Sequence, residues 1–405
     1  MHCVRILGRV GIVICLLAAC SPTLTKTSQG TETAPAATRE PAPLLTETVP
    51  AATPGPTPLP TETVPPDTHE PIPLPLSEPG PYGVGLRRFT VTDPARNDRE
   101  VAISLWYPAV QSAGSTNGPV FWVQDADPDP REAPYPLILS STKMANTFAR
   151  YVVSHGFAWA SVDKIDTYRK MGEQMIDQPL DILFALNQVA SVPPEELEGM
   201  IDAEHAGVTG YSFDGNNTLA MSGARIDPEY YLAQCPIPDA TTKSLISDGL
   251  SAFDCGPADA WDEFAAHAGE AITTSEDGLW QPMTDKRIRA VIPMAAEGWW
   301  LYGKKGLAAE DRPALMIIGS WDGLYPENAL IFEHLRTPEK TMITFMNRDH
   351  ASMVSPSFPE LQARIAHFMV AFFGYHLQGR EDYAEYFSEP FVAQYNDLAW
   401  GVFEK

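Results

Sequence analysis

Six short apolar runs, separated by helical patterns, constrain the fold of this chain more than any other feature. Their residues do not alternate with polar ones, which is typical of strands that are buried on both faces. Buried strands that alternate with helices predict an α/β fold with a doubly wound, mostly parallel sheet. The runs are Pro136–Leu139, Ala158–Val162, Ala206–Val208, Ala290–Pro293, Ala314–Ile318 and Thr341–Phe345.

Two further segments extend this sheet at its beginning. Leu86–Val91 and Val101–Tyr107 alternate apolar and polar residues, as antiparallel strands with one wetter face do. Near the other end, Leu361–Leu377 has apolar residues at helical spacing and predicts a long helix that covers one face of the sheet.

The first nineteen residues have the features of an export signal. Arg5 and Arg9 form a basic start, and Val10–Leu17 is an apolar stretch too short to span a membrane. The ending Leu17-Ala18-Ala19-Cys20 resembles a bacterial lipobox, which predicts that Cys20 is lipidated and becomes the mature N-terminus. Ordinary cleavage beside an incidental cysteine is the alternative. Acyl chains on Cys20 would anchor the protein in the cell envelope without a spanning helix.

Residues 20–78 are rich in Pro and Thr and contain a repeat. Thr-Glu-Thr-x-Pro begins at Thr31, Thr46 and Thr61. Such a segment cannot bury a core, so it predicts a disordered tether between the anchor and a folded domain over residues 79–405.

Cysteines and charge limit the classes of function further. Once the signal is removed and Cys20 is lipidated, only Cys235 and Cys255 remain, and an even pair in an exported chain favours a disulfide. Two free buried thiols are the alternative.

The net charge of −24 makes nucleic-acid binding a poor hypothesis, since phosphates would be repelled.

A serine follows the third apolar run in a pattern with chemical meaning. In Gly210-Tyr211-Ser212-Phe213-Asp214-Gly215, a buried strand meets a small residue, then the serine, then a helix-forming stretch. This order predicts a nucleophile elbow, a turn that lifts a serine hydroxyl above the end of the sheet. Asp214 occupies the position that is glycine in the usual G-x-S-x-G pattern.

A serine nucleophile needs a base, and the base needs a carboxylate to orient it. Asp322 follows the apolar run that ends at Ile318, and His350 follows the last run. Serine, acid and histidine in this chain order, each after a strand, predict the triad Ser212, Asp322 and His350. Asp322 as a helix cap, Asp349 as a rival acid and His350 as a surface histidine are the alternatives.

Residues 80–380 resemble the dienelactone hydrolase or platelet-activating-factor acetylhydrolase-like branch of the α/β-hydrolases. The resemblance is carried by the three triad motifs and by the segments Pro81–Gly85, Leu105–Pro108, Gln178–Ile182 and Asp285–Val291. It implies hydrolysis of carboxylic esters through an acyl-serine intermediate. It also implies a cap insertion after the nucleophile helix, here at about 224–285 and holding both Cys235 and Cys255.

The oxyanion loop departs from that family's pattern. Where the family carries His-Gly after the strand that corresponds to Pro136–Leu139, this chain reads Ser141-Thr142-Lys143-Met144. The backbone N–H of Lys143 or Met144, together with that of Phe213, is predicted to hold the oxyanion. An acid at position 214 predicts a rate penalty if it lies near that charge.

The sequence therefore predicts a lipid-anchored serine esterase acting on a small-molecule ester or lipid-like substrate. Trp299 and Trp300 follow the fourth apolar run and are candidates for a substrate pocket, with cap packing as the alternative. No cofactor and no metal site are predicted. The competing hypothesis is a catalytically impaired hydrolase fold that serves as a binding lipoprotein.

Overall fold

The computed structural model describes residues 74–111, 121–163, 172–246 and 253–403. The predicted signal peptide (1–19), Cys20 and the predicted tether up to residue 73 lie outside these ranges, so the hypotheses about them stay predictions. Over the described ranges, no helix is both long enough and apolar enough to cross a membrane.

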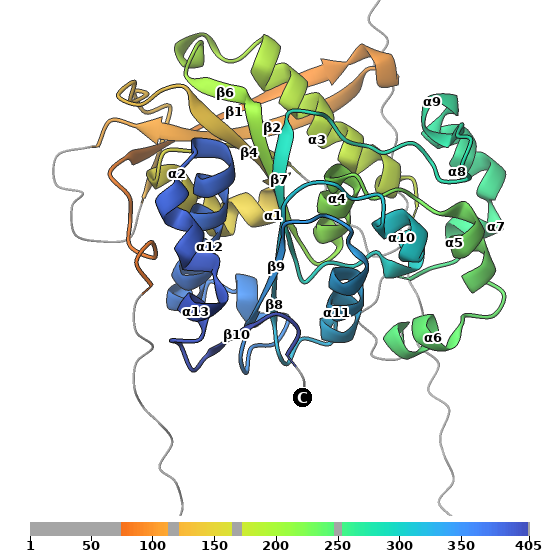
Figure 1. Cartoon of the computed structure of the whole chain (residues 1–405). Coiled ribbons are helices and arrows are strands. Elements are labelled where there is room, and N and C mark those ends of the chain that lie inside the picture. The colour runs from red at the N-terminus through yellow and green to blue at the C-terminus, as the bar shows by residue number, and fades with distance from the viewer. Residues whose placement is uncertain (1–73, 112–120, 164–171, 247–252, 404–405) are drawn as a thin grey trace, which may run out of the picture. The chain divides into compact units, whose positions relative to one another are not determined.

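One ten-stranded sheet forms the centre of the domain (Figure 1). Its strands lie in the order β10-β9-β8-β7-β6-β4-β5-β2-β1-β3. Neighbours from β9 to β5 run parallel, whereas β2 is antiparallel to both β1 and β5, and β10 is antiparallel to β9. The strands are β1 (Gly83–Asp93), β2 (Arg99–Ala109), β3 (Trp122–Gln124), β4 (Tyr135–Ser141), β5 (Ala158–Val162), β6 (Ile201–Tyr211), β7 (Ile288–Met294), β8 (Ala314–Gly319), β9 (Lys340–Phe345) and β10 (Leu398–Trp400).

Helices cover both faces of this sheet, so the predicted α/β class with a mostly parallel sheet is confirmed. In Figure 1, α2 and α12 lie on one face, and α3, α4 and α11 lie on the other. The larger helices are α3 (Gln174–Ser191), α4 (Phe213–Ser222), α10 (Trp299–Leu307), α11 (Tyr325–His334) and α12 (Pro359–Gln378), and the short ones after β4 are α1 (Thr142–Met144), η2 (Ala145–Ala149) and α2 (Arg150–Ser154). The remaining short elements are η1 (Pro94–Arg96), η3 (Glu195–Leu197), η4 (Ser352–Val354), η5 (Glu381–Phe387) and α13 (Glu389–Val392).

The helix predicted over Leu361–Leu377 is α12, and its sequence explains both its ends and its burial. Pro359 occupies the first turn, where its missing N–H has no cost. Gly379 ends the helix with φ of 69°, a conformation that glycine adopts without strain. Between these ends, Phe368, Phe372 and other large side chains are buried, and each contributes about 1.5–3 kcal/mol to folding.

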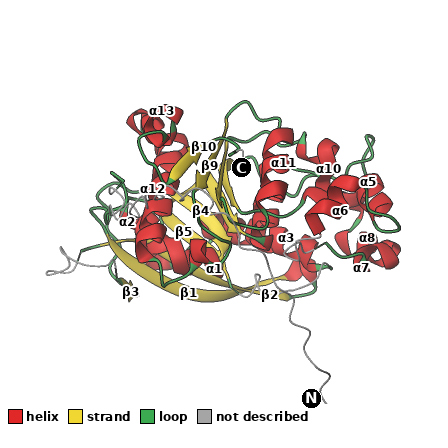
Figure 2. Ribbon diagram, turned by 90° about the horizontal axis from the view of Figure 1, so that it is seen from below, coloured by secondary structure: helices red, strands yellow, loops and turns green. Residues whose placement is uncertain are grey.

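In the described residues between α4 and β7, where the sequence predicted a cap insertion, the chain forms five short helices. Figure 1 and Figure 2 show helices of this group beside α10, at the edge of the domain. α5 packs directly on α10, and Tyr230 of α5 meets the ring of Trp299 edge-on at 6.1 Å between centroids. The helices are α5 (Pro228–Gln234), α6 (Ala240–Ile246), α7 (Gly256–Asp259), α8 (Trp261–Ala268) and α9 (Glu270–Thr273).

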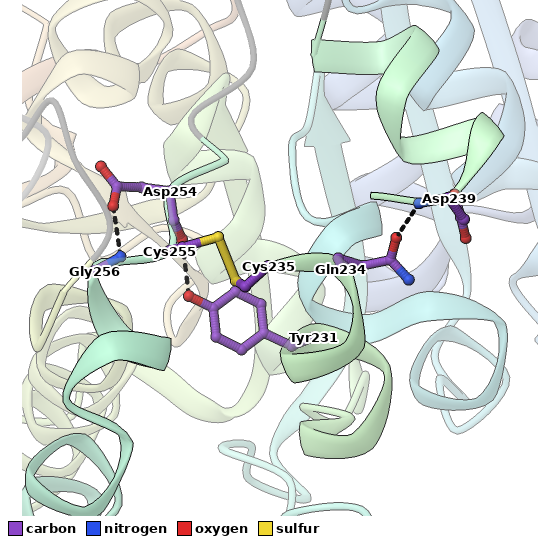
Figure 3. The surroundings of a disulfide bond; sticks show 7 residues. All are labelled: Tyr231, Gln234, Cys235, Asp239, Asp254, Cys255 and Gly256. Carbon is purple, nitrogen blue, oxygen red and sulfur yellow. Dashed lines mark hydrogen bonds between the residues drawn. A yellow bond between two sulfur atoms is a disulfide. The ribbon is translucent and has the colours of Figure 1, made fainter. Parts of the chain in front are cut away.

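Cys235 and Cys255 lie at disulfide distance within this helical group, with their Cα atoms 5.5 Å apart (Figure 3). Beside them, the Tyr231 hydroxyl donates a hydrogen bond of 2.8 Å to the Asp254 carbonyl. The predicted pairing is therefore present, and it joins the end of α5 to the residue before α7 across a separation of 20 residues. A cross-link of this length stabilises a fold by about 3 kcal/mol in the chain-entropy model.

Candidate active site

Ser212 stands at a sharp turn between β6 and α4. Its φ of 62° and ψ of −128° are strained for a residue with a side chain, and such strain is concentrated at functional sites. The turn is held from both sides, because the Ser212 N–H donates to the Met294 carbonyl at 3.0 Å and the Gly215 N–H donates to the Ser212 carbonyl at 2.8 Å. The turn thus has the geometry that the sequence predicted for a nucleophile elbow.

Two glycines allow this turn to pack so tightly. A Cβ at Gly210 would lie 2.1 Å from the Asp214 carbonyl oxygen, and one at Gly215 would lie 2.7 Å from the Ala296 Cα. Both distances are far inside van der Waals contact, so neither position accepts a side chain. The usual G-x-S-x-G pattern has a glycine at the position of Asp214. In this chain, Gly215 instead allows α4 to pack closely against the residues after β7.

The structure brings the three predicted triad residues together from three strand ends. His350 Nε2 lies 3.0 Å from Ser212 Oγ, and His350 Nδ1 lies 2.8 Å from Asp322 Oδ2. The Asp322 side chain is fully buried, while that of His350 keeps 24% of its surface exposed. The other oxygen of Asp322 accepts the Leu324 N–H at 2.9 Å. The same carboxylate therefore both caps the turn before α11 and orients the imidazole.

Tyr211, which the sequence did not single out, supports the histidine. Its ring lies 4.8 Å from the His350 imidazole, and its hydroxyl donates a hydrogen bond to the His350 carbonyl oxygen. Burial raises the pKa of Tyr211, so the hydroxyl stays protonated and keeps donating. The Lys143 ammonium lies 4.9 Å from the centre of the same ring.

The predicted oxyanion loop follows β4 and begins a helix. Thr142, Lys143 and Met144 form α1, which continues through η2 into α2 with helical backbone throughout. The loop is fixed at its start, since the Thr142 hydroxyl donates to Asp163 Oδ1 at 2.7 Å. The amides of a helix's first turn have no carbonyl partner within the helix, which suits them to an anion. Phe213 opens α4 and lies in the first turn of that helix.

Asp214, the departure from the usual motif, has its carboxylate buried against protein donors. Its side chain accepts the Ser141 N–H at 3.4 Å and the Asn217 amide at 3.0 Å, and only 4% of the residue is exposed. Asn217 in turn donates to Gln178 of α3 at 2.8 Å. Asp214 therefore ties the end of β4, where the oxyanion loop begins, to the helix that follows the nucleophile.

Glu297 is a residue of the site that sequence reasoning missed. Its Oε1 lies 3.3 Å from Ser212 Oγ, and only 3% of the residue is exposed. The signal that could have found it is its position, because it follows β7 by three residues and lies at the same sheet edge as the triad. The serine hydroxyl thus has two acceptors in reach, His350 and Glu297.

Two side chains of α11 hold the loop that carries Glu297. Asn328 accepts the Ala296 N–H and donates to the Ala296 carbonyl, both at 2.9 Å. Glu327 Oε1 accepts the N–H groups of Gly298 and Trp299 at 2.8 and 3.0 Å. The main chain on both sides of Glu297 is therefore held by hydrogen bonds to side chains of α11.

The Glu327 clamp predicts a dependence of stability on pH. Burial raises the pKa of Glu327 from 4.5 to about 7, although its two N–H donors oppose that rise. Between these values the folded chain keeps a proton that the unfolded chain has released, so the free energy of unfolding falls as the pH rises. Gln at this position keeps an oxygen for both N–H groups and does not titrate. Relative to wild type, Glu327→Gln should gain about 3 kcal/mol between pH 4.5 and 7.

Urea unfolding at these two pH values measures that difference. Glu333→Gln is the matched control, because Glu333 lies on the same helix with its side chain exposed. Parallel pH profiles for wild type and Glu327→Gln would contradict a titrating clamp.

The two tryptophans predicted to line a pocket are both buried, but they have different neighbours in the structure. Trp300 faces the nucleophile region, with its ring 6.4 Å from Phe213 and 6.2 Å from Phe253. Trp299 instead packs against Tyr230 and, at 5.1 Å, against His334 of α11. Trp300 therefore has the better position for a substrate contact, and Trp299 joins α10 to the helical insertion.

Among the described residues, no group of three or more His, Cys, Asp or Glu side chains is arranged to hold a metal ion.

Comparison of the chain with models of known protein families and with curated proteins finds no match.

Proposed function

We propose that the chain is a serine hydrolase of the α/β-hydrolase type, which cleaves carboxylic esters through an acyl-serine intermediate. The observation that carries this proposal is the continuous contact from Ser212 through His350 to the buried Asp322. A strained serine between a strand and a helix, followed along the chain by an acid and then a histidine, is how α/β-hydrolases arrange their catalytic residues. The altered oxyanion loop begins after β4 and still offers first-turn amides.

The mechanism follows from the positions of these groups. His350 Nε2 takes the proton of Ser212 Oγ as that oxygen attacks the ester carbonyl carbon, and the buried Asp322 stabilises the imidazolium. The imidazolium then gives its proton to the alkoxide oxygen of the leaving alcohol, and the C–O bond of the ester breaks. In the second half, water attacks the acyl-serine with His350 again as base, which releases the acid and restores Ser212.

The charge that develops on the carbonyl oxygen needs donors on the side of the nucleophile away from His350. The Phe213 N–H and one N–H of Lys143 or Met144 are the candidates, since the two helix starts flank the elbow. By holding Ser141, Asp214 positions the second of these helix starts.

Hydrolysis of short p-nitrophenyl esters by the full chain tests this proposal. We expect turnover by the wild type and none above background for Ser212→Ala. Ser222→Ala is the matched control, because Ser222 lies in the same helix with its hydroxyl bonded to the Leu219 carbonyl. Equal rates for Ser212→Ala and wild type would exclude Ser212 as the nucleophile.

A second candidate is a hydrolase fold that binds esters or lipids without turnover. Glu297 beside the nucleophile is the observation that favours it, since a carboxylate there can hold the serine hydroxyl away from His350. Binding of an ester without release of its alcohol would support this candidate.

We also propose that the protein is exported and anchored by lipid on Cys20, with residues 20–78 as a tether. The cysteine pair at disulfide distance supports an oxidising location. Metabolic labelling with a fatty acid should mark the wild type and not Cys20→Ala, and equal labelling of both would contradict the anchor.

A further inference from the structure

Tyr211 contacts the catalytic base of the proposed mechanism at two separate points. The centre of its ring lies 4.8 Å from the centre of the His350 imidazole, with 32° between the two ring planes. Its hydroxyl donates a hydrogen bond to the His350 carbonyl oxygen. Only 1% of Tyr211 is exposed, so its side chain has little freedom to move. One buried side chain therefore holds both the main chain and the ring of His350.

His350 depends on such support because it lies in a loop. β9 ends at Phe345 and the next helical turn, η4, begins at Ser352, so the backbone of His350 belongs to neither element. On the side away from the nucleophile, the imidazole is held at Nδ1 by the bond of 2.8 Å to Asp322. A single hydrogen bond holds the nitrogen atom but leaves the plane of the ring free to tilt. Packing against the ring of Tyr211 restricts that tilt.

The position of the imidazole matters because the serine hydroxyl has a second acceptor in reach. His350 Nε2 lies 3.0 Å from Ser212 Oγ, and Glu297 Oε1 lies 3.3 Å from the same atom. Hydrogen bonds weaken steeply as their distance and angle depart from the ideal values. Displacement of the imidazole by about half an ångström would therefore leave the hydroxyl closer to Glu297 than to the base.

Tyr211 can set this distance because it belongs to the same strand as the nucleophile. It is the last residue of β6, directly before Ser212, and it pairs with Met294 of the neighbouring strand β7. His350 follows β9, which is separated from β6 by β7 and β8. The contact between Tyr211 and His350 thus ties the loop that carries the base to the strand that carries the nucleophile.

We propose, on the basis of the serine hydrolase function above, that Tyr211 is a positioning residue for the catalytic base. Its hydroxyl fixes the main chain of His350 and its ring fixes the plane of the imidazole, so that Nε2 stays at hydrogen-bond distance from Ser212 Oγ. Tyr211 acts through His350 and not on the ester itself. Such support matters for the rate, because a shift of about 1 Å in a reacting group can cost about 100-fold.

Tyr211→Phe tests the contribution of the hydroxyl alone. It keeps the ring, and with it the contacts of the ring with the His350 imidazole and with the Lys143 ammonium at 4.9 Å. We expect kcat for a p-nitrophenyl ester to fall by about 10-fold, as loss of one supporting hydrogen bond implies, while KM stays within about twofold of wild type. Tyr211→Leu also removes the ring, and its kcat should fall by about 100-fold.

Tyr302→Phe is the matched control. Tyr302 is also buried, and its hydroxyl donates to the Asn216 carbonyl at 3.2 Å, in the helix that follows the nucleophile. Its kcat should stay within about twofold of wild type. A wild-type kcat in Tyr211→Phe overturns the proposal, and so does a loss that appears in KM alone. An equal loss of kcat in Tyr302→Phe also overturns it, because the effect would then not be specific to the contact with His350.

A double-mutant cycle shows whether Tyr211 acts through the base, which a purely structural role would not do. Tyr211→Phe and His350→Ala are combined, and the slow residual hydrolysis is compared with that of His350→Ala alone. Without the imidazole, removal of the Tyr211 hydroxyl should change this residual rate by less than about twofold. A further loss of about 10-fold, as in the wild-type background, overturns the proposal.

Reaction with a fluorophosphonate separates failure of this proposal from failure of the hydrolase function. No labelling of Ser212 and no ester turnover in the wild type contradict the function itself. Turnover in the wild type with an unchanged kcat in Tyr211→Phe contradicts only the positioning role. Each kcat is calculated per labelled Ser212, so a partly unfolded variant is not counted as a loss of rate. If Tyr211→Phe does not fold, Tyr211→Leu takes its place in the cycle, and a loss that persists without the imidazole overturns the proposal.

Discussion

Replacing His350 by alanine is expected to lower kcat for ester hydrolysis by roughly 10⁴-fold to 10⁶-fold. Without the imidazole 3.0 Å from Ser212 Oγ, the hydroxyl loses the base that is paired with a buried acid, and the leaving alcohol loses its proton donor. Glu297 Oε1 is also within reach of the hydroxyl, at 3.3 Å, but a carboxylate is ordinarily a weaker base than an imidazole. KM should change little, because the loss falls on the chemical step.

The chain offers a matched control in another Asp–His pair. His205 Nδ1 lies 2.7 Å from Asp202 Oδ2, but this pair is exposed and lies on β6 well before the elbow. His205→Ala should keep the wild-type kcat. Steady-state rates for the two variants and the wild type, with folding checked by circular dichroism, provide the test. A His350→Ala enzyme within tenfold of wild type would remove His350 from the mechanism.

Asp322→Asn is expected to lower kcat by about 10⁴-fold. The amide can still cap the turn through its oxygen, so the fold is kept, but it cannot stabilise an imidazolium on Nδ1. The neighbouring acid Asp349 separates this effect from general charge, because its carboxylate accepts the Ser352 N–H at 2.9 Å. Asp349→Asn should therefore leave kcat within a few-fold of wild type. Equal losses of kcat in the two variants would mean that Asp322 acts only through its electrostatic field and not through its hydrogen bond to His350.

The core strands and the triad were predictable because each depends on a local pattern. Unbroken apolar runs marked β4 and the strands from β5 to β9, and the residue that follows each strand end then showed where side chains would meet. β3 and β10 were missed, since three residues give no period to detect and each forms only by pairing with a longer strand. β6 begins at Ile201, ahead of the predicted run, and its start was missed because Asp202, Glu204 and His205 interrupt the apolar pattern.

The supporting residues of the site were not predictable in the same way. Glu297 contacts Ser212 from the loop after β7, whereas Glu327 and Asn328 hold that loop from α11, and no short-range pattern relates these positions. Asp214 was recognised as unusual, but its burial against Ser141 and Asn217 depends on the packing of β4 and α3 around α4. The sequence predicted the triad residues, whereas the residues that support them could be found only from the structure.

The most direct test of the central claim is reaction of the full chain with a fluorophosphonate probe, followed by mapping of the labelled peptide. The probe reacts only with a serine whose hydroxyl is activated by a base. We predict rapid labelling on Ser212 that disappears in His350→Ala and persists in His205→Ala. Folded wild-type protein that stays unlabelled, or that is labelled on a serine other than Ser212, would contradict the account.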